Sequence, residues 1–272
     1  MTASTPPIRP TPPIPRDIPD LPPIPGTPAL PLSPVPAAAV VPPVRRPLTA
    51  IFRLLVALLA TAGVTLELLL GSPARTLSYF SVQSNILLAL IFTASAHRAW
   101  TAGRPLPSST TGAALLYVTI TAGVHHLLLA HITPPFLMTD ATAPPARWHA
   151  QWATLQLLHT AAPLGALVDW LLLTAPGRLH LRQATTWMLY PLAYLAFSLA
   201  RAELLLPDTP ARYLYPFLDV DQHGYKGTLA NALLLGLSFY ALAVLLVALD
   251  HTRPNPVRRR HKTGFRLRPP VG

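Results

Sequence analysis

Apolar residues dominate six consecutive stretches of the chain, and polar or Gly/Pro residues separate them. The stretches cover roughly residues 48–70, 77–96, 111–131, 150–173, 184–205 and 228–249. Each has about 20 residues, the length that a helix needs to cross a bilayer. None has the polar face that the helices of a soluble bundle carry. The pattern predicts an all-α fold, a polytopic six-transmembrane helix bundle over residues 48–250.

Composition favours a membrane protein and excludes several soluble classes. Charged residues make up 11% of the 272 residues, against about 25% in an ordinary soluble domain. Too few charges therefore remain to cover a surface in water. The chain has no cysteine, which excludes disulfide scaffolds, zinc–cysteine modules, iron–sulfur proteins and thiol enzymes.

Prolines and cations are concentrated at the two ends of the chain. Residues 1–47 hold 17 of the 34 prolines, and such a stretch favours an extended, disordered tail because it cannot donate regular backbone hydrogen bonds. Residues 251–272 hold seven of the 21 Lys and Arg residues. This basic tail directly follows an apolar stretch, so we expect it to bind anionic lipid headgroups and not nucleic acid.

Lys and Arg are distributed unevenly between the segments that join the six stretches. Fifteen of them fall on one side of the predicted membrane and four on the other, while Arg53 and Arg201 lie inside stretches. Cytoplasmic segments carry an excess of Lys and Arg. The sequence therefore predicts a multi-pass protein of the cell membrane with both termini cytoplasmic.

A small set of polar and ionisable residues interrupts the apolar stretches. Such residues are costly in hydrocarbon and mark functional sites by default. With the predicted orientation, most of them fall in the outer half of the membrane. The candidates for the site are Glu67, Ser81, Asn85, His125, Gln156, His159 and Arg201.

Helical spacing predicts which of the polar residues share a face. The four predicted faces carry Ser81, Ser84 and Asn85; Tyr117, Thr121 and His125; His149, Trp152, Gln156 and His159; and Tyr190, Tyr194, Ser198 and Arg201. We expect these stripes to face one interior cavity.

Several polar residues have a simpler structural interpretation. Membrane-helix hydroxyls often only bond a backbone carbonyl, and we interpret three residues in this way: Ser84, Thr121 and Ser198. We expect Arg201 to form an ion pair with Glu67 across helices. We expect Asp169 and Arg178 to lie at the inner membrane interface. His159 lies at mid-depth beside Gln156, where an imidazole is harder to explain by packing alone.

Three short motifs resemble one family of membrane proteins. They are Tyr79-Phe80-Ser81-Val82-Gln83-Ser84-Asn85, Leu158-His159-Thr160 followed by Pro163, and Tyr215-Pro216-Phe217-Leu218-Asp219. The chain resembles bacterial members of the FAR-17a/androgen-induced-gene-like family, also called "Pr-six-Pr" membrane proteins, over roughly residues 48–250. The Tyr215–Asp219 segment is the most specific match.

The resemblance implies an activity and two site residues. Animal members are intramembrane hydrolases of fatty acid esters of hydroxy fatty acids, with a threonine nucleophile and a histidine. The resemblance places Ser81 at the threonine position and His159 at the histidine position. This chain departs from the family pattern by having Ser as the nucleophile and by displacing the proline after the histidine by one residue.

The residues themselves are compatible with this chemistry. A hydroxyl becomes a nucleophile when a base removes its proton, and histidine suits that role near neutral pH. Asn85 or Gln156 could donate to the developing oxyanion. No acidic third member is evident, and Glu67 is the least unfavourable candidate for that role. The reaction needs no cofactor and no metal, and its substrate would be a lipid ester that reaches the site from the bilayer.

Other classes of function stay open at this stage. His125 or His126 facing His159 would suit a bis-histidine haem site, and Asp219, Asp221 and His223 would suit a metal site in the outer segment. A transporter with a polar site at the membrane midplane, or a structural membrane protein, would also fit the pattern. The absence of a clear inverted repeat between the first three stretches and the last three disfavours the transporter.

Overall fold

The computed structural model describes residues 44–132, 136–138, 147–207 and 209–254. The prediction of a Pro-rich tail over 1–47 falls almost entirely outside these residues. The same is true of the basic tail, of which only residues 251–254 are described.

Helices account for the regular structure of the described residues, so the predicted all-α class is confirmed for them. Two helices begin with a proline, at Pro47 and Pro73, where the missing N–H costs nothing. The carboxylate of Asp219 caps the last helix by accepting from the backbone N–H of Gln222. The helices are α2 (Pro47–Leu70), α3 (Pro73–Thr76), α4 (Phe80–Trp100), α5 (Ser108–Val124), α6 (Trp148–Gln156), α7 (Ala162–Val168), α8 (Leu181–Trp187), α9 (Leu189–Leu204) and α10 (Val220–Thr252).

Short turns of other helical types extend or join several of these helices. The π-turn η1 (His125–Leu129) continues α5, η3 (Leu157–Ala161) joins α6 to α7, and η4 (Asp169–Leu173) continues α7. The 3-10 turn η5 (Pro216–Leu218) precedes α10. Because π-turns often accompany functional sites, η1 and η3 mark candidate positions for one.

Five helical segments of the described chain are long and apolar enough to cross a membrane. They are Pro47–Leu70, Phe80–Trp100, Ser108–Leu129, Trp148–Leu173 and Val220–Thr252. The sixth predicted stretch, 184–205, differs from the expectation because it is divided at Met188 into α8 and α9. Neither of these two helices alone reaches the length of the five long segments.

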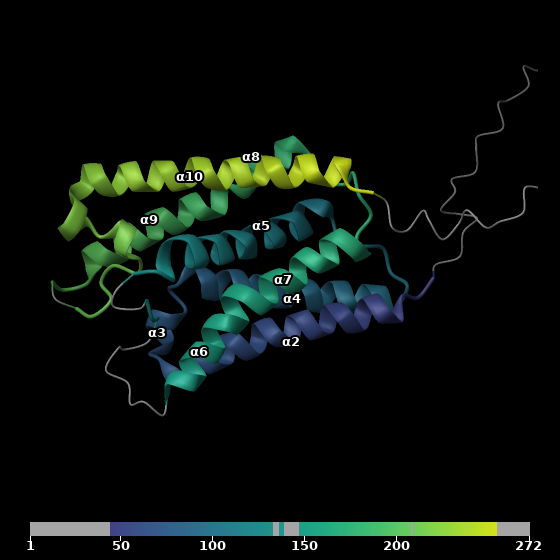
Figure 1. The fold of residues 1–272 in the computed structure, drawn as a ribbon, viewed down its shortest axis with the longest axis horizontal. Helices are drawn as coiled ribbons and strands as arrows, with labels where there is room; N and C mark the ends of the chain where they lie inside the picture. Colours follow the sequence, from purple (N-terminus) through teal and green to yellow (C-terminus); the bar gives the residue numbers. More distant parts are fainter. Residues whose placement is uncertain (1–43, 133–135, 139–146, 208, 255–272) are drawn as a thin grey trace, which may run out of the picture. The chain divides into compact units, whose positions relative to one another are not determined.

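The helices of residues 44–254 pack side by side (Figure 1). The segment α6–η3–α7 lies against α2, which also packs along α4, while α5 packs on α4 and α7. Two glycines allow close approach at the first of these contacts. A Cβ at Gly63 would lie 2.8 Å from Leu158, and one at Gly165 would lie 2.7 Å from Val56.

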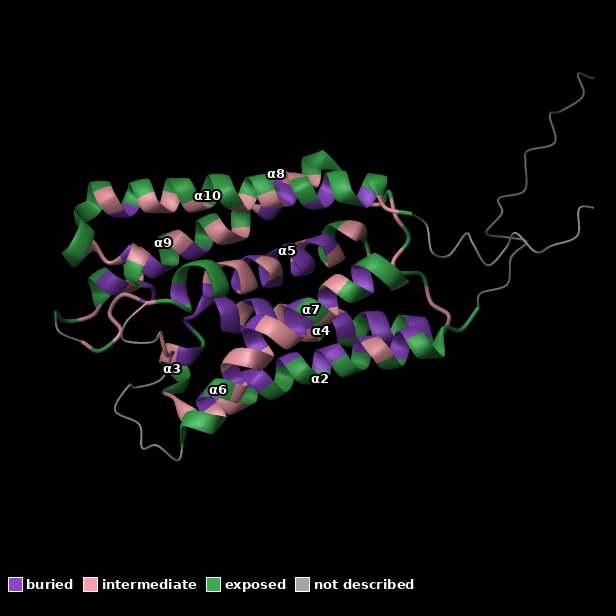
Figure 2. Cartoon of the chain, in the orientation of Figure 1, coloured by how far each residue is buried: buried purple, intermediate pink, exposed green. Residues whose placement is uncertain are grey.

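The described chain exposes large apolar side chains and buries polar ones, which suits a lipid environment and not water. Large apolar side chains, including Leu58, Leu172 and Leu234, are exposed on the outside, whereas Ser84, Asn85 and Thr154 are fully buried. Figure 2 shows the exposed positions along the outer faces of the helices and the buried ones between them. The described chain is a multi-span helical membrane protein, in which the bilayer covers the exposed leucines.

Candidate functional site

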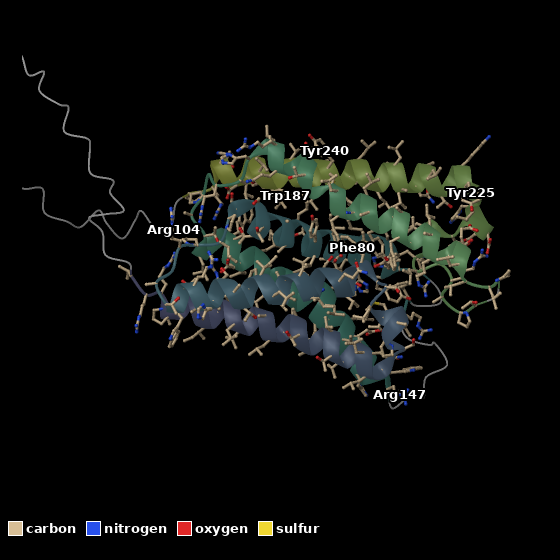
Figure 3. The ribbon with its side chains drawn as sticks, turned by 180° about the vertical axis from the view of Figure 1, so that it is seen from behind. Phe80, Arg104, Arg147, Trp187, Tyr225 and Tyr240 are labelled. Atoms are coloured by element: carbon tan, nitrogen blue, oxygen red, sulfur yellow. The ribbon has the colours of Figure 1, made fainter. Side chains whose placement is uncertain are left out.

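A cavity of about 420 Å³ lies among helices α4, α5, α8, α9 and α10 and the turns η1, η3 and η5. This volume is in the range of small-molecule sites, roughly 300–1,000 Å³. Phe80, labelled in Figure 3, is one of its wall residues. The polar members of its described lining are Ser81, Thr121, His125, His159, Thr185, Tyr194 and Tyr215, and the remaining members are apolar.

Ser81 lies in the first turn of α4 and is buried. Its hydroxyl donates to the thioether sulfur of Met138 at 3.4 Å. Sulfur in a thioether is a weak acceptor, so this contact leaves the hydroxyl available to a stronger partner. The side chain of Tyr215 also lies beside Ser81.

Tyr215 brings a phenol to the same end of the cavity. Burial raises the pKa of this phenol to about 12, and hydrogen bonding with Ser81 offsets part of that rise. The phenol is therefore neutral at physiological pH and can donate a hydrogen bond. Its ring packs edge-on against Tyr79, with 5.8 Å between the ring centroids, and stacks on Phe136 at the same distance.

His159 lies within the π-turn η3 and is also buried. Its Nδ1 is 3.1 Å from the carbonyl oxygen of Leu155. A carbonyl can only accept, so Nδ1 carries the proton and Nε2 is left as the basic nitrogen. Pro163 has no N–H to donate to the carbonyl of His159, which interrupts the α-helical ladder at this point. The bond just before it runs from Ala162 N–H to Leu157 O, five residues back.

Two further histidines adjoin His159. The His125 ring lies against the His159 ring, with 4.3 Å between their centroids and 31° between their planes. Nδ1 of His125 is buried without a hydrogen-bond partner in the described structure. His126 instead contacts the Thr160 hydroxyl through Nε2 at 3.0 Å. Rings stacked this closely leave no space for a macrocycle between them, which disfavours a bis-histidine haem site built from His125 and His159.

The prediction that His149, Trp152, Gln156 and His159 form one inward stripe is wrong. His149 and Trp152 are exposed, Gln156 is half-buried and absent from the described cavity lining, and His159 is buried. An α-helical period cannot relate residues on the two sides of a π-turn, because that turn contains an extra residue. By contrast, the faces predicted for Ser81, Ser84 and Asn85 and for Tyr117, Thr121 and His125 are confirmed as buried.

The contacts of Asn85 do not fit its predicted role as an oxyanion donor. Its amide nitrogen donates to the carbonyl of Ser81 at 2.8 Å and to the carbonyl of Leu158 at 3.1 Å. Both amide hydrogens are thus used, and Asn85 is absent from the described cavity lining. The amide instead connects the backbone at Ser81 to the residue that directly precedes His159.

Glu67 and Arg201 do not form the predicted ion pair. Arg201 donates to the backbone carbonyls of Ala211 and Arg212 at 3.0 and 3.1 Å. Glu67 is buried, and its Oε1 has no hydrogen-bond partner among the residues that the structure describes. Neither residue belongs to the described lining of the cavity, and no acidic residue does.

A buried ion pair at the opposite end of the bundle was not predicted. Arg53 donates to both carboxylate oxygens of Asp169, at 2.7 and 3.1 Å, and to the Ser95 hydroxyl at 2.8 Å. Asp169 is 6% exposed, so it lies between the helices and not on the outside of the bundle. The occurrence of Arg53 inside an apolar stretch was the available signal, because such a charge needs a partner.

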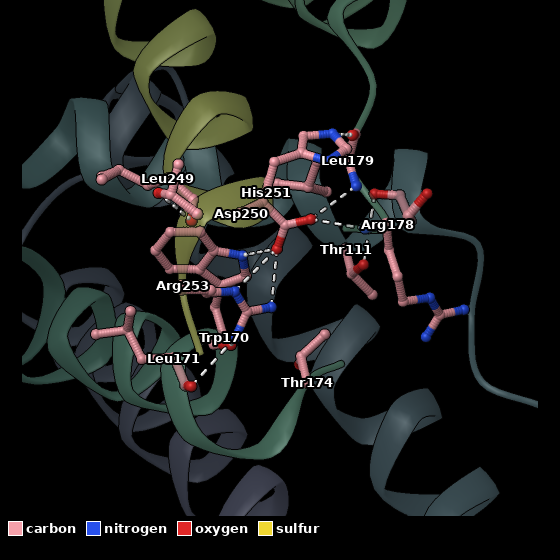
Figure 4. A network of polar contacts seen from close by, with 12 residues as sticks. Thr111, Trp170, Leu171, Thr174, Arg178, Leu179, Leu249, Asp250, His251 and Arg253 are labelled. Atoms are coloured by element: carbon pink, nitrogen blue, oxygen red, sulfur yellow. Dashed lines mark hydrogen bonds and ion pairs between the residues drawn. The ribbon is translucent and has the colours of Figure 1, made fainter. Parts of the chain in front are cut away.

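Asp250 organises a second network at this same end (Figure 4). Its carboxylate accepts from the Trp170 indole, from the Arg253 guanidinium, and from the backbone N–H groups of Arg178 and Leu179. Arg253 also donates to the carbonyl of Trp170. These contacts fix the end of α10 to η4 and to the segment before α8, so they are structural.

Asp219 and Asp221, at the start of α10, are also accounted for by structural contacts. Asp219 caps α10, and Asp221 accepts from Arg212 at 2.9 Å and from the Tyr213 hydroxyl at 3.1 Å. No group of three or more His, Asp or Glu side chains in the described ranges is arranged to hold a metal ion.

Comparison with known proteins adds no relative, since no family model, curated protein or solved structure matches the chain.

Proposed function

We propose that this protein is an intramembrane lipid-ester hydrolase with Ser81 as its nucleophile and His159 as its base. The observation that carries the proposal is that both side chains line one largely apolar cavity inside a membrane protein. The motif resemblance to the androgen-induced-gene-like family supports the same pair of residues.

The proposed reaction follows the chemistry of the two side chains. Nε2 of His159 takes the proton of the Ser81 hydroxyl while Oγ attacks the carbonyl carbon of the ester. The tetrahedral intermediate collapses, the ester C–O bond breaks, and the leaving alcohol takes the proton from His159. Water then attacks the acyl-serine with His159 again as base, which releases the fatty acid and restores Ser81.

Tyr215 is the best candidate to stabilise the oxyanion. Asn85 cannot do so in the described arrangement because its amide hydrogens are used, and Gln156 is not among the described lining residues. Tyr215 lines the cavity beside Ser81 and its phenol is neutral. A preorganised neutral donor in a largely apolar site stabilises developing negative charge effectively.

We also propose six membrane crossings with both termini cytoplasmic. The Trp187 indole of α8 donates to the carbonyl of Ser109, at the start of α5, and Tyr194 of α9 donates to the carbonyl of Ser78, just before α4. The segment α8–α9 therefore runs from near the start of α5 to near the start of α4. This supports a crossing in two pieces, which adds to the five long segments. The bias in Lys and Arg supports a cytoplasmic location for the termini and for the basic tail against anionic headgroups.

The hydrolase is tested by labelling membranes with a fluorophosphonate probe, which reacts with an activated serine. We expect labelling of the native protein and its loss in Ser81→Ala and in His159→Ala. Ser84→Ala is the matched control, because Ser84 is buried one turn away and is absent from the described cavity lining. Equal labelling of native, Ser81→Ala and His159→Ala proteins would exclude this pair.

A further inference from the structure

Some residues of the cavity wall also face the outside of the bundle. Leu189 and Leu192 of α9 line the cavity and are 66% and 63% exposed. Gly236 of α10 lines the cavity and is exposed as well. Because the outside at these apolar helices is lipid, the cavity opens between α9 and α10 into hydrocarbon.

Helix α10 forms a loosely packed side of this opening. Only 17% of its most apolar window is buried, against 39% to 56% in the other four long segments. Its cavity-facing stripe is Ala232, Leu235, Gly236 and Phe239. A Cβ built at Gly236 meets nothing within 4 Å, so the glycine leaves space in the middle of the stripe.

The composition of the cavity indicates what fills it. The described lining has no charged residue, and its polar members include the neighbouring Ser81 and Tyr215 and the neighbouring His125 and His159. Its α9 wall from Met188 to Leu195 spans roughly 10 Å of helix. An apolar passage with an uncharged polar end suits an acyl chain that carries an uncharged polar group, and it disfavours a phosphate that would need a cation.

We propose that the gap between α9 and α10 is a portal through which the acyl chain of one neutral membrane lipid enters and binds in this cavity. The surrounding bilayer supplies the ligand, so no opening to water is required. That the bound acyl chain belongs to a substrate rests on the proposed hydrolase. That an acyl chain binds in the cavity does not.

The experiment uses the full chain in phosphatidylcholine vesicles with a clickable monoacylglycerol that carries a diazirine on its acyl chain. After illumination, the labelled peptides are identified by mass spectrometry. We expect saturable labelling of α9 and α10 residues at the cavity, with competition by unlabelled monoacylglycerol. Phosphatidylcholine carrying the same diazirine chain should label these positions at least about fivefold less.

Variants separate the portal from the outer lipid-facing surface. Gly236→Trp should reduce cavity labelling at least about tenfold because the indole fills the gap, and Leu192→Trp should do so from the α9 side. Leu237→Trp is the matched control, because Leu237 is 59% exposed on α10 and does not line the cavity. Leu192→Trp provides an independent test if Gly236→Trp does not fold.

The outcomes also separate this proposal from the hydrolase. Ser81→Ala should lose fluorophosphonate labelling while lipid labelling of α9 and α10 stays saturable, because it removes the nucleophile and leaves the apolar passage. Lipid labelling without any fluorophosphonate labelling would support the portal and overturn the hydrolase. Unsaturable labelling spread over the outer leucines, or unchanged cavity labelling in both Trp variants, would overturn the portal.

Discussion

At the scale of single residues, Asn85 has the clearest positioning role. One amide group holds two carbonyls, that of Ser81 on α4 and that of Leu158 in η3. Ser81 and His159 are therefore kept in register by a residue that does not itself line the described cavity. Polar side chains that bridge membrane helices in this way contribute about 0.6 kcal/mol per hydrogen bond on average, and up to about 1.7 kcal/mol.

Replacement of Asn85 by alanine should therefore destabilise the protein by about 1 to 2 kcal/mol and lower fluorophosphonate labelling. Thermal unfolding in detergent measures the first effect and the labelling rate measures the second. The matched control is Ser84→Ala, whose hydroxyl has no hydrogen-bond partner in the described structure, and it should leave both quantities nearly unchanged. An Asn85→Ala protein as stable as the native one would show that the two bonds are unimportant.

Tyr215 should act on the chemistry and not on lipid binding. Its pKa of about 12, raised by burial, keeps the phenol protonated throughout the physiological range, so it is a hydrogen-bond donor there. Loss of one oxyanion donor lowers turnover by about 100-fold or more. We expect Tyr215→Phe to slow fluorophosphonate labelling by about this factor while binding of the photoreactive monoacylglycerol stays unchanged. A parallel loss of both signals would indicate a structural role.

At the scale of helices, the sequence predicted five of the six spans and two of their buried faces correctly, and it failed where the helix type changes. The faces of α4 and α5 follow the α-helical period, so Asn85 and Thr121 are buried as predicted. The π-turn that contains His159 breaks that period. Pro163 was visible in the sequence, but proline is tolerated in membrane helices through several backbone adjustments, and its position alone does not select a π-turn.

Contacts between residues far apart in the chain were the second feature that the sequence did not predict. Arg53 and Asp169 are 116 positions apart, and Tyr215 reaches Ser81 from the segment before α10. Helical spacing relates residues within one helix and carries no information on which helices are neighbours. The candidate pair Ser81 and His159 came from the motif resemblance, and only the fold places both in one cavity.

Helix packing makes a sharp prediction at Gly63. A Cβ there would lie 2.8 Å from Leu158, the residue before His159. Gly63→Val should therefore push η3 away from α2 and destabilise the protein by about 1 to 3 kcal/mol, the usual cost of overpacking. Gly123→Val is the matched control, because a Cβ at Gly123 meets nothing within 4 Å. Thermal unfolding in detergent compares the two variants, and equal stability would contradict the close α2–η3 contact.

At the scale of the whole molecule, the division of the sixth stretch decides the topology. The described chain has five long apolar segments, and an odd number of crossings would place its two ends on opposite sides of the membrane. If α8 and α9 together make a sixth crossing, both ends lie on one side. The Lys and Arg bias agrees with the second arrangement, since both tails are basic.

The absence of cysteine from the sequence makes this topology directly measurable, because every introduced thiol is the only one. We expect a membrane-impermeant maleimide to label His223→Cys in intact cells, and to label Thr101→Cys and Arg182→Cys only after permeabilisation. All three positions are exposed, and Arg182 lies at the start of α8 whereas His223 lies beyond the end of α9. Thr101 is the reference position for the cytoplasmic side. It follows α4, whose crossing does not depend on whether α8–α9 crosses the membrane. Labelling of Arg182→Cys and His223→Cys from the same side would show that α8–α9 does not cross, and the portal would then border a helix pair that returns to the side from which it came.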